Sequence, residues 1–442
     1  MLAEFPLRLV PGLAGRLAFY WRSQHWSAER LERHVDERLR LLIRRAARQV
    51  PYYRELFRQI GFDPESFRGR RDLPLIPLLD KETLRQRSME FLADDIGRLD
   101  PVWERTSGST GTPLRLLLSA ECRVNDAAAT LRSYAWAGFF PGRKVFTLRW
   151  YMRDWLFCAT MAGRSLNADS MKLTRETARV LWAEINRLKP EVFHGQPFPL
   201  LMLATFAREA GLAYHCPSRV ITFGESMPPS LRTRLSEAYG GAQVFDFYGM
   251  TENAALITQC RHGSLHALDD YACHEFVDER GAPVEQGRGE IVGTGYYNHA
   301  MPLIRYRTRD FATLSRERER CRCGSPFRVV QGIEGRMEDF VLTPDGRSIN
   351  LFEEPIEVGT GIVASQYVQD APDHLYVNIL PGPDFAPATL GAVEEKLRQQ
   401  VGPGMRLEFR VVDQLERRSA TSAKIPFLIS RIGNTIYRQD EV

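Results

Sequence analysis

TSGSTGTP, residues 106–113, is a glycine-rich turn between two segments that read as strands. Its glycines let the backbone approach an anion closely, and its hydroxyl and N–H groups can donate hydrogen bonds to anionic oxygens. No Gly-Lys-Ser or Gly-Lys-Thr follows, so the turn is not a Walker loop. Its composition therefore leaves two interpretations open, a flexible connection and a phosphate-binding loop.

The segments around this turn predict an α/β protein. From Val102 to Met250, short apolar runs such as KVFTLRW (144–150) alternate with helical stretches such as ETARVLWAEINRLK (176–189). This alternation favours a parallel sheet. Before the turn, apolar residues recur at helical spacing over residues 27–58, where Ser27 can cap the first helix.

Residues after about 340 predict a small separate α+β domain. A Pro-Asp-Gly turn at 344–346 joins two short strands, and a helix at 389–401 lies between strands at 374–380 and 406–412. A chain of 442 residues is too long for one ordinary domain, so a second domain is expected on length as well.

Composition narrows the class of protein. Hydrophobic residues make up 44% and charged residues 26%, which is typical of a folded globular protein. The net charge of +4 is spread along the chain, which suits small anionic ligands and argues against a nucleic-acid partner. Seven scattered cysteines indicate a reducing, cytoplasmic location. No run of about 20 apolar residues predicts a transmembrane segment, although contact of the first 22 residues with a membrane surface stays open.

The glycine-rich turn resembles the phosphate-binding loop of the adenylate-forming superfamily, in particular its phenylacetate–CoA ligase branch with the capsule-biosynthesis relatives. Further motifs follow in the family's order. Phe223-Gly224-Glu225-Ser226 is similar to the adenine-binding turn, and Phe247-Tyr248-Gly249-Met250-Thr251-Glu252 to the next nucleotide motif. Arg305-Tyr306-Arg307-Thr308-Arg309-Asp310 resembles the ribose motif, and Gly335-Arg336-Met337-Glu338-Asp339 the interdomain hinge. Lys424 lies where the family keeps its catalytic lysine, so the resemblance covers about residues 27–430.

The resemblance implies a fold and an activity. The fold would be a large adenylate-forming N-terminal domain with parallel sheets, residues 1–338, and a small mobile α+β lid, residues 339–442. The activity would be ATP-dependent activation of a small aromatic or short carboxylic acid as its acyl-adenylate, followed by acyl transfer to coenzyme A. Two alternatives stay open: an amide ligase that passes the acyl group to an amine or a carrier protein, and a non-catalytic nucleotide-binding protein. A homodimer also stays open.

Roles for individual residues follow from the same resemblance. Lys424 would be catalytic, Glu252 would bind Mg²⁺, Tyr248 would stack on adenine, Asp310 would accept the ribose hydroxyls and Asp339 would be the hinge. The remaining nucleotide-binding candidates are Thr106, Ser107, Gly108, Ser109, Thr110, Gly111, Gly224, Glu225, Ser226, Gly249, Thr251 and Arg336. The candidates for the acid pocket are Tyr134, Trp136, Phe139, His194 and Gly195.

Each of these roles has a structural alternative. Lys424 could be an exposed lysine, Glu252 a helix cap, Asp310 a turn residue and Tyr248 part of the core. Three positions also depart from the family pattern. Leu114 follows Pro113 where many relatives have lysine, Arg309 replaces a usual glycine, and Ala423 stands where glycine usually precedes the lysine.

Cys260, His266, Cys321 and Cys323 form a second constellation. Thiolate and imidazole are the preferred ligands of zinc, and a Cys-x-Cys-Gly turn can present two sulfurs together. From the residues alone, ordinary reduced thiols are the alternative, and Cys273, His262 and His274 could substitute as ligands. Several phenylacetate–CoA ligase-like proteins show a similar pattern, which implies a zinc site. Four protein ligands would make that zinc structural, because a catalytic ion needs an open position.

Overall fold

The computed structural model of the chain describes residues 12–105, 114–149, 154–225, 227–315, 321–336, 341–345, 348–349, 361–382, 385–416 and 428–432. The chain forms two compact units, each made of several stretches of sequence. The first unit contains Met1–Arg143, Ile221–Gly224 and Phe245–Glu334. The second contains Lys144–Val220, Glu225–Val244 and Gly335–Val442. The boundary expected between residues 338 and 339 stays a prediction.

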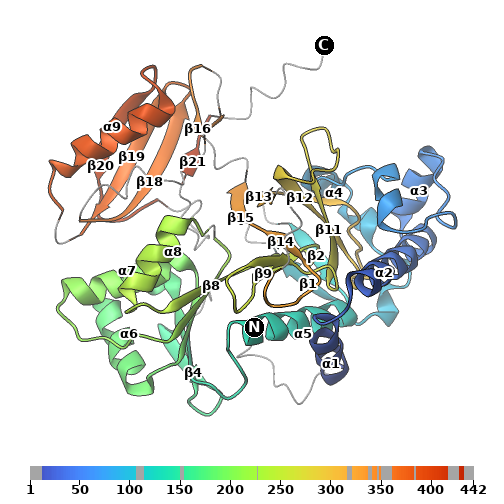
Figure 1. Cartoon of the computed structure of the whole chain (residues 1–442), viewed down its shortest axis with the longest axis horizontal. Helices are drawn as coiled ribbons and strands as arrows, with labels where there is room; N and C mark the ends of the chain where they lie inside the picture. The colour runs from blue at the N-terminus through green and yellow to red at the C-terminus, as the bar shows by residue number, and fades with distance from the viewer. Residues whose placement is uncertain are drawn as a thin grey trace. The chain divides into compact units, whose positions relative to one another are not determined.

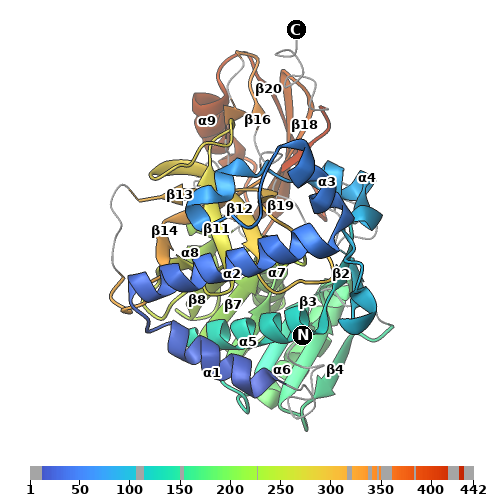
Figure 2. The ribbon, with the colours of Figure 1, turned by 90° about the vertical axis from the view of Figure 1, so that its right-hand side faces the viewer.

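The first unit begins with a helical layer. Its helices are α1 (Leu13–Ser23), α2 (Ala28–Gln49), α3 (Pro51–Gln59), α4 (Lys81–Gln86) and α5 (Ala120–Trp136), with short 3-10 turns η1 (Arg70–Leu75), η2 (Ser88–Phe91) and η3 (Ile96–Arg98). The Ser27 side chain accepts a hydrogen bond from the Arg30 amide at the start of α2. The helical spacing seen in residues 27–58 is confirmed, with a break at Val50 because Pro51 starts a new helix. Figure 2 shows α2 lying across strand β11.

Antiparallel pairs join many of the strands of the first unit. Strands β8 (Gln243–Gly249), β9 (Leu256–Gln259), β10 (Leu265–Ala267) and β14 (Arg328–Val330) pair in that order. A second sheet contains β11 (Ala272–Val277), β12 (Gly287–Gly295), β13 (Tyr306–Leu314) and β15 (Gly332–Arg336). Strands β1 (Val102–Arg105) and β2 (Arg115–Leu118) pair on either side of the glycine-rich turn, as the sequence predicts.

The second unit carries the parallel strands that the alternating pattern predicts. Strand β3 (Val145–Arg149) pairs in parallel with both β5 (Ser165–Asp169) and β6 (Val192–Gly195), and β4 (Phe157–Thr160) is antiparallel to β5. Helices α6 (Arg175–Leu188), α7 (Pro197–Glu209) and α8 (Pro229–Ala238) contribute to the apolar core of this unit (Figure 1). The turn η4 (Ser170–Lys172) precedes α6, and β7 comprises Arg219–Phe223, of which residues 219–220 belong to the second unit and residues 221–223 to the first.

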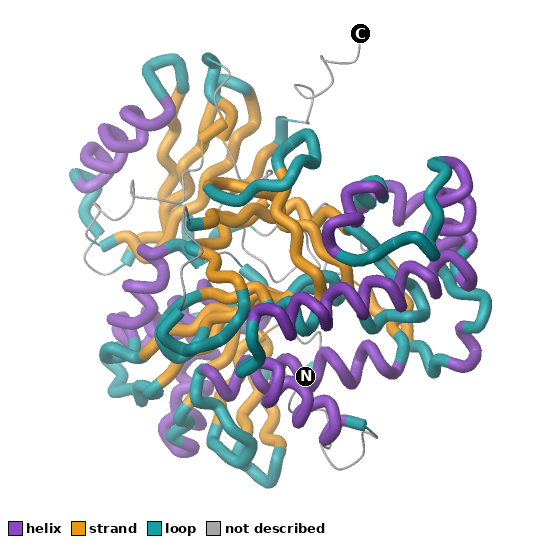
Figure 3. The backbone as a smooth tube through the Cα atoms, turned by 45° about the vertical axis from the view of Figure 1, so that its right-hand side comes forward, coloured by secondary structure: helices purple, strands orange, loops and turns teal. Residues whose placement is uncertain are grey.

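The C-terminal stretch of the second unit has its own α+β core, as predicted. Its sheet has the order β20 (Arg406–Val411), β19 (His374–Pro381), β18 (Ile362–Ala371) and β21 (Leu428–Ser430). Helix α9 (Thr389–Val401) buries Val393, Leu397 and Val401, and Figure 3 shows it on one side of these strands. Strands β16 (Val341–Leu342) and β17 (Ser348–Ile349) form the short pair around the predicted Pro344 turn. Among the residues described, no helix is long and apolar enough to cross a membrane.

Candidate nucleotide and metal sites

Tyr248 and Asp310 meet within the first unit. Tyr248 lies near the end of β8, and its hydroxyl donates a 2.7 Å hydrogen bond to Asp310 Oδ2 on β13. Asp310 is 9% exposed, and its amide donates a 3.0 Å hydrogen bond to the hydroxyl oxygen of Thr308. The two residues assigned to adenine and ribose are therefore neighbours, although 62 positions separate them in the chain.

Glu252 lies in the turn that follows β8. No helix begins there, because residues 253–255 are irregular and β9 starts at Leu256, so Glu252 is not a helix cap. Its Oε1 accepts a 3.1 Å hydrogen bond from the hydroxyl of Tyr306 on β13. The sequence interpretation did not assign Tyr306 a role, because its partner is 54 positions away and only the tertiary structure brings the two together.

Two glycines hold the turn of Glu252 against strand β12. A Cβ atom on Gly293 would lie 2.2 Å from the carbonyl oxygen of Ala254, and one on Gly295 would lie 2.4 Å from that of Asn253. Neither distance leaves room for a side chain, so only glycine permits this close approach. Asn253 has a φ of 53°, and its Oδ1 accepts a 2.6 Å hydrogen bond from the Tyr271 hydroxyl.

Arg309 adopts the backbone that its usual glycine would adopt. Its φ is 64°, in the left-handed region. The ladder between β12 and β13 shifts register between Glu290 and Val292, opposite this residue. Glu290 stabilises the distortion, because it accepts from the Arg309 amide at 3.1 Å and pairs with the Arg307 guanidinium at 2.5 Å. The turn beside Asp310 is therefore kept without the glycine.

The structure describes only some of the remaining nucleotide-binding candidates. Gly224 has a φ of 78°, and Gly249 contacts Phe247 so closely that a Cβ there would lie 2.8 Å from its ring. Glu225 accepts a 3.1 Å hydrogen bond from Gln196 in the second unit. Thr251 precedes Glu252 in the turn, and Arg336 ends β15. The candidates outside the described residues are Thr106, Ser107, Gly108, Ser109, Thr110, Gly111, Ser226, Asp339 and Lys424.

The acid-pocket candidates fall in separate places. Tyr134 packs against Phe139 and Phe247 in the first unit, with ring centroids 6.2 and 5.4 Å away. His194 and Gly195 lie on β6 in the second unit, and a Cβ on Gly195 would meet the Leu148 carbonyl at 2.3 Å. Close strand packing thus accounts for this glycine. Trp136, also on α5, packs its ring against His266 of the cysteine and histidine cluster.

That cluster is brought together as the sequence predicts. The ligand atoms of Cys260, His266, Cys321 and Cys323 all lie within 4.8 Å of one another. Cys260 Sγ is 3.6 Å from Cys321 Sγ, and Cys323 Sγ is 3.4 Å from His266 Nε2. A tetrahedral zinc ion with bonds of about 2.3 Å to sulfur holds its sulfurs roughly 3.8 Å apart. The spacing therefore fits zinc.

The surroundings of the cluster also suit a metal. His266 Nδ1 is 3.3 Å from the carbonyl oxygen of Phe327, which leaves Nε2 to face the sulfurs. The amides of Cys323 and Ser325 donate to the sulfurs of Cys321 and Cys323. Burial raises the pKa of the Cys323 thiol to about 12, so a bound cation would be needed to keep its thiolate at neutral pH.

The three substitute ligands do not join this group. His274 is fully engaged, because its Nε2 accepts from the Leu256 amide at 3.0 Å and its Nδ1 is 2.9 Å from Asp269. Arg70 and His274 offset the effect of burial on Asp269 and lower its pKa to about 2. Cys273 is buried near Arg70, and His262 Nε2 accepts from Arg261 at 3.2 Å.

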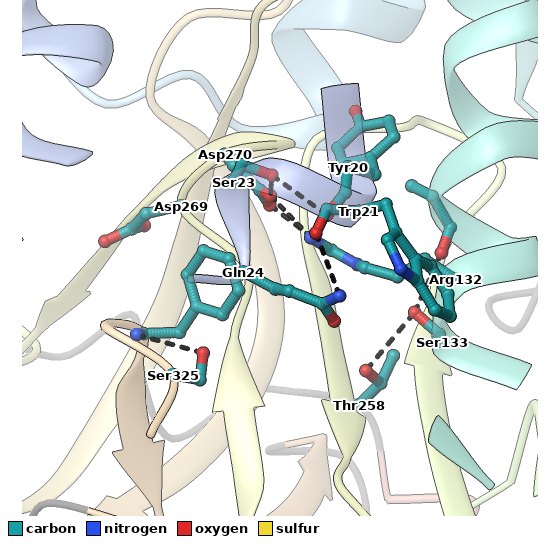
Figure 4. A network of polar contacts seen from close by, with 12 residues as sticks. Tyr20, Trp21, Ser23, Gln24, Arg132, Ser133, Thr258, Asp269, Asp270 and Ser325 are labelled. Carbon is teal, nitrogen blue, oxygen red and sulfur yellow. Dashed lines mark hydrogen bonds and ion pairs between the residues drawn. The ribbon is translucent and has the colours of Figure 1, made fainter. Parts of the chain in front are cut away.

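A buried ion pair lies next to the cluster. Arg132 on α5 binds Asp270 through two hydrogen bonds of 2.5 and 3.1 Å, and neither side chain is exposed. Figure 4 shows Ser23 and Tyr20 of α1 around this pair, and Ser23 also donates to Asp270. The rings of Trp136 and Phe327 lie 5.2 Å from the Arg132 guanidinium, and Trp136 is 5.9 Å from His266. The cluster is thus packed against Trp136 at the end of α5.

Comparisons with known proteins agree with these features. A family described as AMP-binding enzyme matches residues 106–297, and the CapK C-terminal domain matches residues 341–431. A phenylacetate-coenzyme A ligase of Thermus thermophilus is 28% identical over 74% of this chain and 75% of its own. An indoleacetate–lysine synthetase of Pseudomonas savastanoi is 22% identical over 58% of this chain and 62% of its own. A crystal structure of 2-hydroxyisobutyryl-CoA ligase in the postadenylation state shares the fold, with a TM-score of 0.75, 20% identity, and coverage of 97% and 95%.

Proposed function

Because the chain belongs to the adenylate-forming superfamily, as an AMP-forming ligase, we propose that it activates a small carboxylic acid with ATP and passes the acyl group to coenzyme A. The observation that supports this most is the pair of carboxylates, Asp310 and Glu252, each held by a tyrosine within the first unit. A protein that only bound nucleotide would need a ribose acceptor, but it would have no need for a second carboxylate of this kind.

In the first step, an oxygen of the acid attacks the α-phosphorus of ATP. A bond forms between that oxygen and phosphorus, the bond to the bridging oxygen breaks, and pyrophosphate leaves. Both reactants are anions, so positive charge must offset their repulsion and hold them in line. We assign this work to Lys424, and we assign Mg²⁺, which neutralises phosphate charge when bound, to Glu252.

The remaining assignments concern orientation of the nucleotide. Asp310 has two carboxylate oxygens, which suits it to accept hydrogen bonds from the two ribose hydroxyls. Tyr248 is partly exposed, and we assign stacking on adenine to its ring. We assign contact with the phosphates to the turn 106–111, contact with ribose or phosphate to Arg336, and the role of hinge for a C-terminal lid to Asp339.

We assign a structural zinc ion to Cys260, His266, Cys321 and Cys323. The ion would fasten the hairpin of β9 and β10 to the segment that enters β14. Strand β9 also pairs with β8, in register at Tyr248 and Ile257. The metal would therefore stabilise the strands next to Tyr248, and it would take no part in the reaction.

In the second step, the thiol of coenzyme A attacks the acyl carbon, a thioester forms and AMP leaves. Relatives named phenylacetate-coenzyme A ligase favour this acceptor. The relative named indoleacetate–lysine synthetase favours an amine instead, which makes an amide ligase the second candidate. None of the seven cysteines forms a disulfide, which suits the reducing cytoplasm where either acceptor is abundant.

The acceptor can be tested after the acid is found. Pyrophosphate release would be measured across a panel of aromatic, alkanoic and hydroxy acids, and the acyl-adenylate of the best acid would be trapped on the enzyme. Coenzyme A and a set of amines, including lysine, would then be added separately. We expect rapid AMP release with coenzyme A. Rapid release with an amine and none with coenzyme A would replace the thioester assignment with the amide one.

A further inference from the structure

The two carboxylates of the candidate nucleotide site are held reciprocally. Tyr248 and Glu252 belong to one motif, and Tyr306 and Asp310 belong to the other. The tyrosine of each motif donates to the carboxylate of the other, at 2.7 Å for Tyr248 and Asp310 and at 3.1 Å for Tyr306 and Glu252. Each motif thus supplies one carboxylate and the donor that orients the other carboxylate.

Tyr306 is held firmly enough to orient a partner. Its side chain is 2% exposed, and its backbone forms an isolated parallel bridge with Leu79. The Leu79 amide donates to the Arg305 carbonyl, and the Arg307 amide donates to the Leu79 carbonyl, both at 2.9 Å. A tyrosine has few rotatable bonds, so burial of its ring fixes the position of its hydroxyl.

The backbone of the turn that contains Glu252 is also fixed. Gly293 and Gly295 allow the backbone of residues 253 and 254 to touch β12, and Tyr271 holds the Asn253 side chain. The backbone of the turn therefore has little freedom. The hydrogen bond from the Tyr306 hydroxyl then fixes the orientation of the Glu252 carboxylate.

We propose that Tyr306 is a positioning residue that makes Glu252 a one-oxygen ligand of magnesium. Its hydroxyl occupies Oε1 and leaves Oε2 for the ion. Mg²⁺ is the smaller ion and requires near-octahedral geometry with short bonds, whereas Ca²⁺ readily accepts both oxygens of a carboxylate. Tyr306 thereby raises the affinity for Mg²⁺ and disfavours Ca²⁺. The inference rests on the proposed function, in which Glu252 is the magnesium ligand.

The test compares Tyr306→Phe with Tyr248→Phe, since each variant keeps the ring and removes one hydroxyl. Acid-dependent pyrophosphate release would be measured against free Mg²⁺ at saturating ATP, and again with Ca²⁺ as competitor. Because loss of a group that orients a metal ligand commonly lowers metal affinity by 10- to 100-fold, we expect Tyr306→Phe to raise half-saturating Mg²⁺ about tenfold and to weaken discrimination against Ca²⁺. Tyr248→Phe should instead raise the KM for ATP and change half-saturating Mg²⁺ less than about twofold.

A purely structural role gives a different result. If Tyr306→Phe lowered the melting temperature but left the Mg²⁺ and Ca²⁺ dependence unchanged, Tyr306 would only pack the core and the proposal would be wrong. If Tyr306→Phe fails to fold, Glu252→Asp tests the same positioning role. Its shorter side chain keeps the negative charge but no longer reaches the hydroxyl of Tyr306. An unchanged Mg²⁺ requirement in that variant would equally overturn the proposal.

The proposed function can fail separately. If the wild-type protein released no pyrophosphate with any acid, the adenylation assignment would be wrong. Calorimetric titration of ATP into the protein at varied Mg²⁺, without any acid, would still report the metal requirement of nucleotide binding. The same tenfold difference between wild type and Tyr306→Phe is expected there, and equal requirements would reject the positioning role.

Discussion

Two places in the first unit connect the same two stretches of chain in different ways. Residues 248–266 meet residues 306–323 at the tyrosine–carboxylate pairs and again at the cysteine–histidine cluster. The tyrosine pairs are joined by direct hydrogen bonds between strong donors and acceptors. The cluster gathers three sulfurs and an imidazole, which are weak hydrogen-bonding partners and strong metal ligands.

The two places therefore contribute differently: the cysteine–histidine cluster stabilises the fold, and the tyrosine–carboxylate pairs serve the reaction. A metal that ties its binding free energy to folding makes the cluster a source of stability. The tyrosine–carboxylate hydrogen bonds form without a bound ligand. The carboxylates are therefore already oriented when nucleotide and Mg²⁺ bind. Loss of the cluster should therefore lower the melting temperature, and loss of a hydroxyl should change the metal or ATP requirement.

The largest effect on stability is expected at the cluster. Cys321→Ser should remove about one equivalent of zinc per chain and lower stability by about 3 kcal/mol, or roughly 5–10 °C in melting temperature. Metal analysis after dialysis and calorimetric melting would measure both quantities. Cys216→Ser, at an exposed cysteine, is the matched control and should change neither.

Two outcomes would contradict this side of the comparison. A wild-type protein without metal, with all four ligands intact, would remove the zinc assignment. A Cys321→Ser variant that lost its zinc but melted at the wild-type temperature would show that the cluster does not stabilise the unit.

A smaller effect on the free energy of unfolding is expected at the irregularity between β12 and β13 beside Asp310. Arg309 holds a left-handed φ of 64°, which costs a residue with a Cβ atom roughly 1–2 kcal/mol. Arg309→Gly should relieve that strain but gain unfolded-state entropy, for a net stabilisation of about 1 kcal/mol or less. Denaturant unfolding would measure it. Arg309→Ala is the control, because it removes the same side chain and keeps the Cβ; equal stability of the two variants would exclude backbone strain.

Much of the fold could be predicted from local patterns. The alternation after Val102, the Ser27 cap and the α+β character after residue 340 all depend on neighbours in sequence, and the structure confirms them. The cysteine–histidine cluster was also predicted, because thiol and imidazole ligands are rare enough to stand out when they are spaced in pairs.

The missed features depend on contacts between distant residues. Tyr306 reads as an ordinary strand residue, and only the fold brings its hydroxyl to Glu252. Gly293 and Gly295, in the sequence GTG, could have signalled a close backbone approach, but the opposing turn could not be identified. Trp136 was assigned to the acid pocket from its position, whereas its ring contacts His266 because it ends α5 beside the cluster. Its pocket role stays a prediction.

Exchange of labelled pyrophosphate into ATP measures adenylation itself, and it also reports on Glu252 as the metal ligand. The exchange should require an acid in the wild-type protein. It should fall by about 10² or more in Glu252→Gln, which keeps the size of the side chain and removes its charge. Glu279→Gln, at an exposed glutamate, should retain the wild-type rate. Exchange in Glu252→Gln at the wild-type rate, or no acid-dependent exchange in the wild-type protein, would contradict the account.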